Sequence, residues 1–149
     1  GAASNTGPKT GLDRLGRKAR PLADDRRALL DKGLIRALAE LSLAEELKPQ
    51  PINVSKARSK VWLAKVEGNT KLTFQAMVGD KQAIFDFPDL TTKDHATLAK
   101  LVAHFRPENK EALAAAGIYS EITGDTKSAD AYYEKAGSDV KAQIDKLFE

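Results

Sequence analysis

The sequence predicts an α+β fold with a leading helix, a three-stranded antiparallel β-meander and a carboxy-terminal bundle of about four helices. Three observations support this prediction. Apolar residues recur at helical spacing over residues 22–47, the period shortens to that of strands over residues 58–87, and helical spacing returns after residue 90. We expect residues 22–90 and 91–149 to pack as one compact unit, preceded by a basic flexible arm at residues 1–21.

Composition limits the classes of protein to consider. The 149 residues are 42% hydrophobic and 30% charged, which is typical of a globular domain. The chain has no cysteine, which excludes disulfides, cysteine nucleophiles and thiolate metal sites. No apolar run approaches the ~20 residues that span a bilayer. Because the sequence begins at Gly1 rather than Met, we expect upstream residues to be missing, and the compartment, cytoplasmic or exported, stays open.

The amino-terminal arm concentrates positive charge. Residues 1–27 carry seven basic and three acidic side chains, so the net charge of this segment is +4. The net charge of the whole chain is +3, so the remaining residues carry −1. One alternative function is therefore the binding of nucleic acid or an anionic surface through the arm. Nucleic acid is the weaker choice because no aromatic residue is interleaved for base stacking. The candidate basic patch consists of Arg14, Arg17, Lys18 and Arg20.

Residues 22–47 form the first predicted helix. Its apolar stripe is Leu30, Leu34, Leu38 and Leu41. Asp24 and Asp25 suit the positive end of the helix dipole, and we expect the prolines at 49 and 51 to end the helix.

Three apolar segments follow, VWLAKV, KLTFQAMV and QAIFDF, separated by Glu67-Gly68-Asn69 and Gly79-Asp80. Glycine and asparagine accept the positive φ of hairpin turns, so the segments predict an antiparallel meander. In the middle strand we expect one face to point inward and the other to face water. The inward set is Leu72, Phe74, Ala76 and Val78, and the outward set is Lys71, Thr73 and Gln75.

Residues 87–90, Phe-Pro-Asp-Leu, form the expected hinge between sheet and helices. Thr91 and Asp94 have the spacing of a capping box for the next helix. The apolar stripe of that helix is Leu98, Leu101, Val102 and Phe105. We expect Ser138 to cap a last helix that places Val140, Ile144 and Leu147 on one face.

Residues 111–137 indicate a helical hairpin. Gly117 suits a close approach between its two helices, and Gly124-Asp125 suits the turn between them. Ala129, Tyr133 and Ala136 share one face of the second helix. These features resemble the tetratricopeptide repeat family over about one and a half repeats, with Leu113 where the family has a large aromatic and Tyr119 one place before the family's tyrosine. The resemblance implies paired packing helices and a protein partner, whose identity it leaves open.

The order of sheet and repeat is also similar to accessory regions of large bacterial envelope proteins and membrane-anchored serine/threonine kinases. That resemblance implies one part of a larger bacterial protein.

Few residues suggest chemistry. His95 and His104 lie nine residues apart, on opposite sides of a straight helix, so we expect each to be a surface or rim histidine. A second alternative function is a small hydrolase or metal site, which needs one of these histidines to meet Asp86 or Asp89 at the hinge. No nucleophile elbow, phosphate loop or dinucleotide fingerprint occurs. We therefore expect no enzyme, and no catalytic, cofactor-binding or metal-binding residues.

The main functional hypothesis is a non-enzymatic module for protein–protein interaction or scaffolding. Aromatic side chains frequently anchor such interfaces. The candidate contact residues are Trp62, Tyr119 and Tyr132. Tyr133, at the packing position of its helix, is expected in the core.

Overall fold

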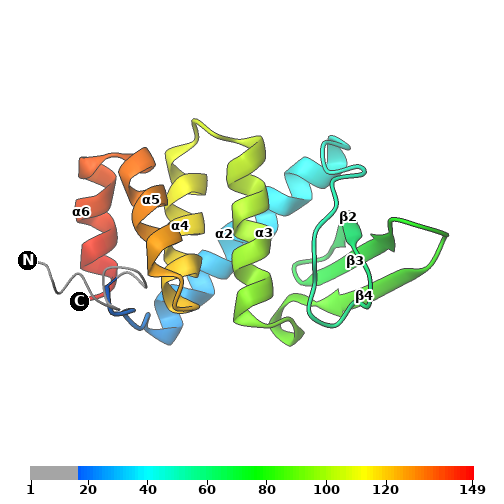
Figure 1. Cartoon of the computed structure of the whole chain (residues 1–149), viewed down its shortest axis with the longest axis horizontal. Coiled ribbons are helices and arrows are strands. Elements are labelled where there is room, and N and C mark those ends of the chain that lie inside the picture. Colours follow the sequence, from blue (N-terminus) through cyan, green and yellow to red (C-terminus); the bar gives the residue numbers. More distant parts are fainter. Residues whose placement is uncertain (1–16) are drawn as a thin grey trace, which may run out of the picture.

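A computed structural model describes residues 17–149. The elements, in chain order, are α2 (Asp24–Leu43), β2 (Val61–Glu67), β3 (Lys71–Ala76), β4 (Gln82–Asp86), the 3-10 turn η1 (Phe87–Asp89), α3 (Thr92–Phe105), α4 (Lys110–Ile122), α5 (Thr126–Ala136) and α6 (Ser138–Leu147). Helices α3 to α6 stand side by side, the sheet lies beyond α3, and α2 runs obliquely across the row (Figure 1). This is the α+β architecture that the sequence predicts.

Helix α2 ends earlier than expected. Its last residue is Leu43, well before Pro49, because Glu45 adopts a left-handed conformation with φ of 56°. The backbone N–H of Glu46 then bonds to the carbonyl of Leu41 at 3.0 Å, which closes the helix end. The apolar stripe is where the spacing places it, and Leu34, Leu38 and Leu41 are buried.

The sheet is an antiparallel meander with the strand order β2-β3-β4. Gly68 and Gly79 have positive φ in its two turns, as the hairpin pattern predicts. The expected alternation along β3 is wrong at two positions. The strand ends before Val78, which lies in the turn and is 91% exposed. Thr73 is buried because it belongs to the central strand, flanked by Lys65 of β2 and Ile84 of β4.

One apolar core joins the sheet to the helices. Leu63, Leu72 and Phe74 on the inner face of the sheet belong to the same cluster as the buried residues of α2, α3 and α4. Phe87 of η1 is 1% exposed and adds to this cluster at the hinge. Within residues 17–149, none of the helices combines the length and apolarity that crossing a bilayer requires.

Side-chain caps begin three of the carboxy-terminal helices. Thr91 accepts a bond from the Asp94 N–H at 3.0 Å while Asp94 accepts one from the Thr91 N–H at 3.2 Å, which is the predicted capping box. Asn109 and Asp125 cap α4 and α5 through one bond each, accepted from the N–H of Ala112 at 3.0 Å and of Ser128 at 3.2 Å. The prediction for Ser138 is wrong. Helix α6 begins at Ser138, and its N-cap is Gly137, with no side-chain cap.

The hairpin of α4 and α5 packs through Gly117. A Cβ atom at this position would lie 2.5 Å from Cε1 of Tyr133, so only glycine lets the two helices approach this closely. Tyr133 is 1% exposed, as predicted for a core residue, and Ala129 and Ala136 are buried beside it.

Candidate functional site

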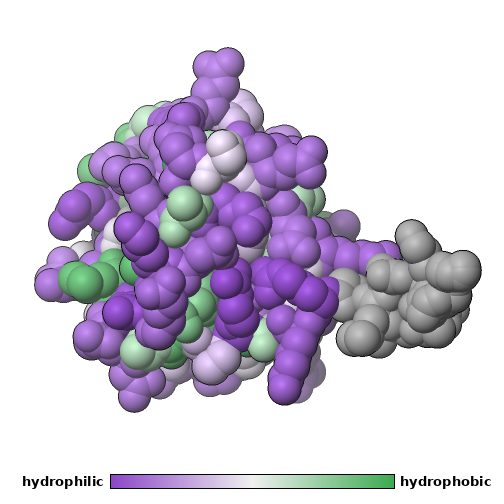
Figure 2. Space-filling view, turned by 90° about the vertical axis from the view of Figure 1, so that its left-hand side faces the viewer, coloured by the Kyte–Doolittle hydropathy of each residue, from purple (hydrophilic) through white to green (hydrophobic). Residues whose placement is uncertain are grey.

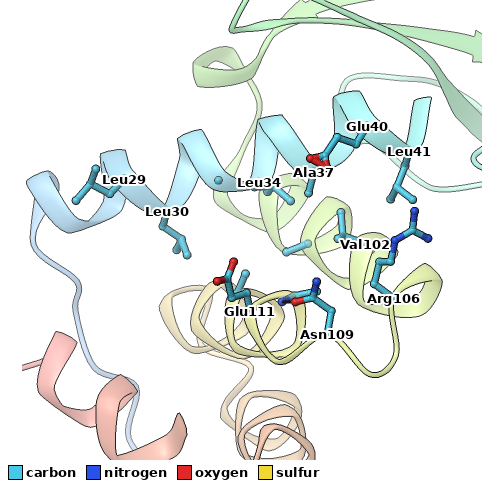
Figure 3. A pocket seen from close by; sticks show the side chains of 14 residues that line it. Leu29, Leu30, Leu34, Ala37, Glu40, Leu41, Val102, Arg106, Asn109 and Glu111 are labelled. Carbon is cyan, nitrogen blue, oxygen red and sulfur yellow. Dashed lines mark hydrogen bonds between the residues drawn. The ribbon is translucent and has the colours of Figure 1, made fainter. Parts of the chain in front are cut away.

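An open groove runs between α2, α3 and α4 (Figure 3). Its volume is about 270 Å³. The floor is apolar and contains Leu30, Leu34, Ala37, Leu41, Ala99, Val102, Ala112 and Ala115. Small side chains leave this space open along the line where α2 crosses α3 and α4. A Cβ atom added at Gly33, on the wall of the groove, would meet nothing within 4 Å.

The rim of the groove carries more negative than positive charge. Arg106 donates to Glu46 through two nitrogens, at 2.9 and 2.7 Å, and this pairing raises the pKa of Arg106 and lowers that of Glu46. The negative charge of Glu40 also raises the pKa of Arg106, without a hydrogen bond between the two side chains. The side chains of Glu40 and Glu111 make no ion pair or hydrogen bond with any residue in the described part of the chain. These two carboxylates are therefore available to a basic partner group.

The expected contact residue Tyr119 is buried, so this prediction is wrong. Tyr119 is 0% exposed, and its hydroxyl donates to Asp31 at 2.5 Å. Burial, followed by the Asp31 carboxylate, raises the pKa of Tyr119. The physical reason is the position of α4, which lies between α3 and α5 while α2 crosses the row (Figure 1); Tyr119 is one of the buried residues of α4.

The other two aromatic candidates remain partly accessible and lie far from one another. Trp62 is half-buried on β2, with the Lys48 ammonium 5.9 Å from its ring centre. Tyr132 is half-buried on α5, with Lys135 5.4 Å from its ring centre. The two elements lie at opposite ends of the molecule (Figure 1), so the pair forms no shared contact surface.

The candidate basic patch is largely neutralised within the chain. Arg17 and Arg20 both donate to Glu121 of α4, whose side chain is fully buried. Arg17 also pairs with Asp130 at 3.0 Å and Arg20 with Asp145 at 2.9 Å. Lys18 is exposed, and Arg14 lies outside the described residues. Residues 17–20 of the expected flexible arm are therefore held against the helices, at the predominantly hydrophilic end of the molecule shown in Figure 2.

Glu121 remains ionised in this setting. Burial alone would raise its pKa, but hydrogen bonds from Arg17, Arg20 and Tyr133 outweigh the burial and hold the pKa at about 2. The Tyr133 hydroxyl donates to Glu121 at 2.7 Å, so the carboxylate also joins α4 to α5. Sequence reasoning missed this residue, although a charged side chain four positions after Gly117 falls on the packed face of the helix.

The hinge does not form the pairing that a hydrolase or metal site needs. His95 is 4% exposed, so the expected surface position is wrong, because η1 and α2 cover the start of α3. Its Nε2 lies 2.6 Å from the Phe87 carbonyl and its Nδ1 lies 2.6 Å from Nη2 of Arg27. Asp86 and Asp89 are exposed and make no bond to His95. Residues 17–149 contain no group of three or more histidine, aspartate or glutamate side chains arranged to hold a metal ion.

The surroundings of His95 favour its neutral form. The Phe87 carbonyl can only accept a hydrogen bond, so Nε2 carries the proton and donates it to that carbonyl. The Arg27 guanidinium donates to Nδ1, so Nδ1 cannot gain a proton without losing this hydrogen bond. Burial, aided by the Arg27 charge, lowers the pKa of His95. The same Arg27 binds Asp31 at 3.0 Å, which links this histidine to the hydroxyl of Tyr119.

Comparisons with known proteins identify no relative. No family model, curated protein or solved structure matches the chain.

Proposed function

We propose that the chain is a protein–protein interaction module whose groove between α2, α3 and α4 receives a helical segment of another protein. The observation that carries the proposal is the groove itself, an open, apolar hollow with charged residues at its rim. Its volume of about 270 Å³ lies just below the roughly 300–1,000 Å³ of small-molecule sites. A space of this size suits a few apolar side chains projecting from a segment that lies along the groove.

The rim favours a particular kind of segment. Helix-in-groove recognition uses apolar anchors at helical spacing, three or four residues apart. Glu40 and Glu111, whose carboxylates form no ion pair or hydrogen bond in the described part of the chain, favour lysine or arginine beside those anchors. The resemblance of α4 and α5 to a tetratricopeptide repeat supports a binding role of the same general class.

The test is a selection of helical peptides from a displayed random library against the chain, followed by measurement of each peptide's dissociation constant. We expect selected peptides to share apolar residues at helical spacing with an adjacent basic residue. Gly33→Leu places its Cβ in open space at the wall of the groove, and we expect the added side chain to obstruct the groove and weaken binding by about tenfold or more, the effect of losing one anchor residue.

The matched control is Ala142→Leu, which adds the same side chain on the exposed face of α6. This control should leave binding unchanged. Selected peptides that bind equally well to Gly33→Leu would contradict the proposal, as would peptides whose affinity is indifferent to Glu40→Gln and Glu111→Gln.

A further inference from the structure

A second accessible apolar surface lies at the turn between β3 and β4, at the end of the molecule opposite α6 (Figure 1). Val78 is 91% exposed and Met77 is 37% exposed. Both line a shallow hollow together with Pro51, Ser59 and Lys60. An aliphatic pair at the tip of a hairpin, beside a proline, contributes little to the core and is available to an apolar environment outside the molecule.

The chain around this hollow is strongly basic. Residues 48–65 contain five basic side chains and no acidic one, namely Lys48, Lys56, Arg58, Lys60 and Lys65. Of these, Lys65 alone forms an ion pair within residues 17–149, with Glu67 at 3.3 Å. Lys81 adds a further charge next to the turn, where its carbonyl accepts a bond from the Ala76 N–H at 2.9 Å.

The distribution of available charge therefore differs from the one that the sequence indicates. Arg17 and Arg20 of the arm are bound by Glu121, Asp130 and Asp145. Lys60 and Lys81, which form no ion pair within the described residues, lie instead beside the apolar side chains at the end of the sheet. We name this patch the sheet-end surface and define it by Lys60, Met77, Val78 and Lys81.

We propose that the sheet-end surface docks on an anionic lipid bilayer. Val78 and Met77 enter the boundary between headgroups and acyl chains, while the lysines contact the lipid phosphates. The exposed aliphatic tip favours a bilayer over nucleic acid, because a phosphate backbone offers Val78 no apolar environment. Base stacking would also need an uncovered aromatic ring, and the ring of Trp62 on β2 has the Lys48 ammonium 5.9 Å from its centre. This proposal uses none of the residues of the groove, so a failure of the groove proposal leaves it unaffected.

The test is co-sedimentation of the full chain with vesicles of phosphatidylcholine alone and of phosphatidylcholine mixed with phosphatidylglycerol. We expect binding to the mixed vesicles that weakens as salt is raised, and little binding to phosphatidylcholine. Val78→Asp should reduce partitioning, and the pair Lys60→Gln and Lys81→Gln should reduce it by about tenfold or more. Asp80→Asn removes the acidic residue of the same turn and should increase partitioning.

Two control pairs separate this surface from net charge and from the arm. Lys32→Gln with Lys127→Gln removes two exposed charges from helices, and Lys9→Gln with Arg14→Gln removes two charges from the sequence before residue 17. Both pairs should leave most of the binding intact. The proposal is overturned if the chain fails to bind mixed vesicles, or if either control pair reduces binding as much as the Lys60 and Lys81 changes do. It is also overturned if a duplex oligonucleotide displaces the vesicles and Val78→Asp leaves binding of the oligonucleotide unchanged.

Discussion

Glu121 stands where the amino-terminal segment meets the helical layer. Its carboxylate accepts bonds from Arg17, Arg20 and Tyr133, so one buried side chain holds together α4, α5 and a segment that is about a hundred residues away in sequence. Both arginines are about one-third exposed, which leaves part of their charge solvated.

Replacing this carboxylate should destabilise the fold. Breaking a fully buried ion pair costs roughly 3–5 kcal/mol, and the exposure of both arginines reduces our expectation for Glu121→Gln to about 1–3 kcal/mol. Urea unfolding of the variant measures the change. Glu134→Gln, at an exposed position of α5 with no ion pair in the described residues, is the matched control and should change stability by less than about 0.5 kcal/mol.

The same substitution has a pH signature. Glu121 has a folded pKa of about 2, below its ordinary value of 4.5, so its stabilisation is complete above the ordinary value and is lost as the pH falls towards 2. The stability gap between the native chain and Glu121→Gln should therefore narrow across this range. A gap that stays constant down to pH 2 would show that the carboxylate is not held ionised by its partners.

Gly117 gives a second prediction at the residue scale. Gly117→Ala places a methyl group 2.5 Å from Cε1 of Tyr133, so it should destabilise the chain by about 1–3 kcal/mol through overpacking. Thermal or urea unfolding checks the change. Gly33→Ala is the contrasting control, since its methyl group enters open space and should stabilise α2 by up to about 1 kcal/mol. Equal effects of the two substitutions would argue against the close packing of α4 on α5.

At the scale of elements, His95 connects three of them. It lies on α3, stacks on Phe87 of η1 at 3.8 Å between ring centres, and accepts a bond from Arg27 of α2. Acidic and basic groups face it from two helices: Arg27 and Asp31 from α2, and Asp94 from α3 itself. The positive charge of Arg27 lowers the pKa of His95, whereas the negative charges of Asp31 and Asp94 raise it.

The buried neutral histidine should make stability depend on pH. The folded pKa is lowered from its ordinary value of about 6.5, so the unfolded chain takes up a proton first and stability falls as the pH drops below that value. The expected slope is at most about 1.4 kcal/mol per pH unit for a single group. His95→Gln should flatten this slope, and His104→Gln, an exposed position on the same helix, should leave it in place. An unchanged slope in His95→Gln would contradict the neutral assignment.

Local patterns predicted most of the elements. The stripe of α2, the turn glycines of the meander, the Thr91–Asp94 box and the contact of Gly117 with Tyr133 all depend on residues close in sequence or on one helix face. Tyr119 and His95 were misplaced for a shared reason. Which face of a helix is covered depends on where a distant helix, here α2, crosses it, and no spacing within the helix encodes that crossing.

On the scale of the whole molecule, the arrangement of α2 determines both what is hidden and what is open. Its crossing buries the network of Asp31 with Tyr119 and leaves the groove beside it, because the side chains at Gly33, Ala37 and Ala112 are too small to fill the space. The groove could not be predicted from the sequence, since its walls come from three helices. The charge distribution was equally hidden, because Arg17 and Glu121 pair across 104 positions of the sequence.

The central claim, that the groove receives an apolar helical segment, is tested most directly by backbone amide NMR shifts during titration with a selected peptide. The account predicts that the largest shifts fall on α2, α3 and α4 along the groove, around Gly33, Ala99 and Ala112. Gly33→Leu should sharply reduce these shifts at the same peptide concentration, in line with binding weakened by about tenfold or more. Shifts centred on the sheet or on α6, or shifts that keep their full size in Gly33→Leu, would contradict the claim.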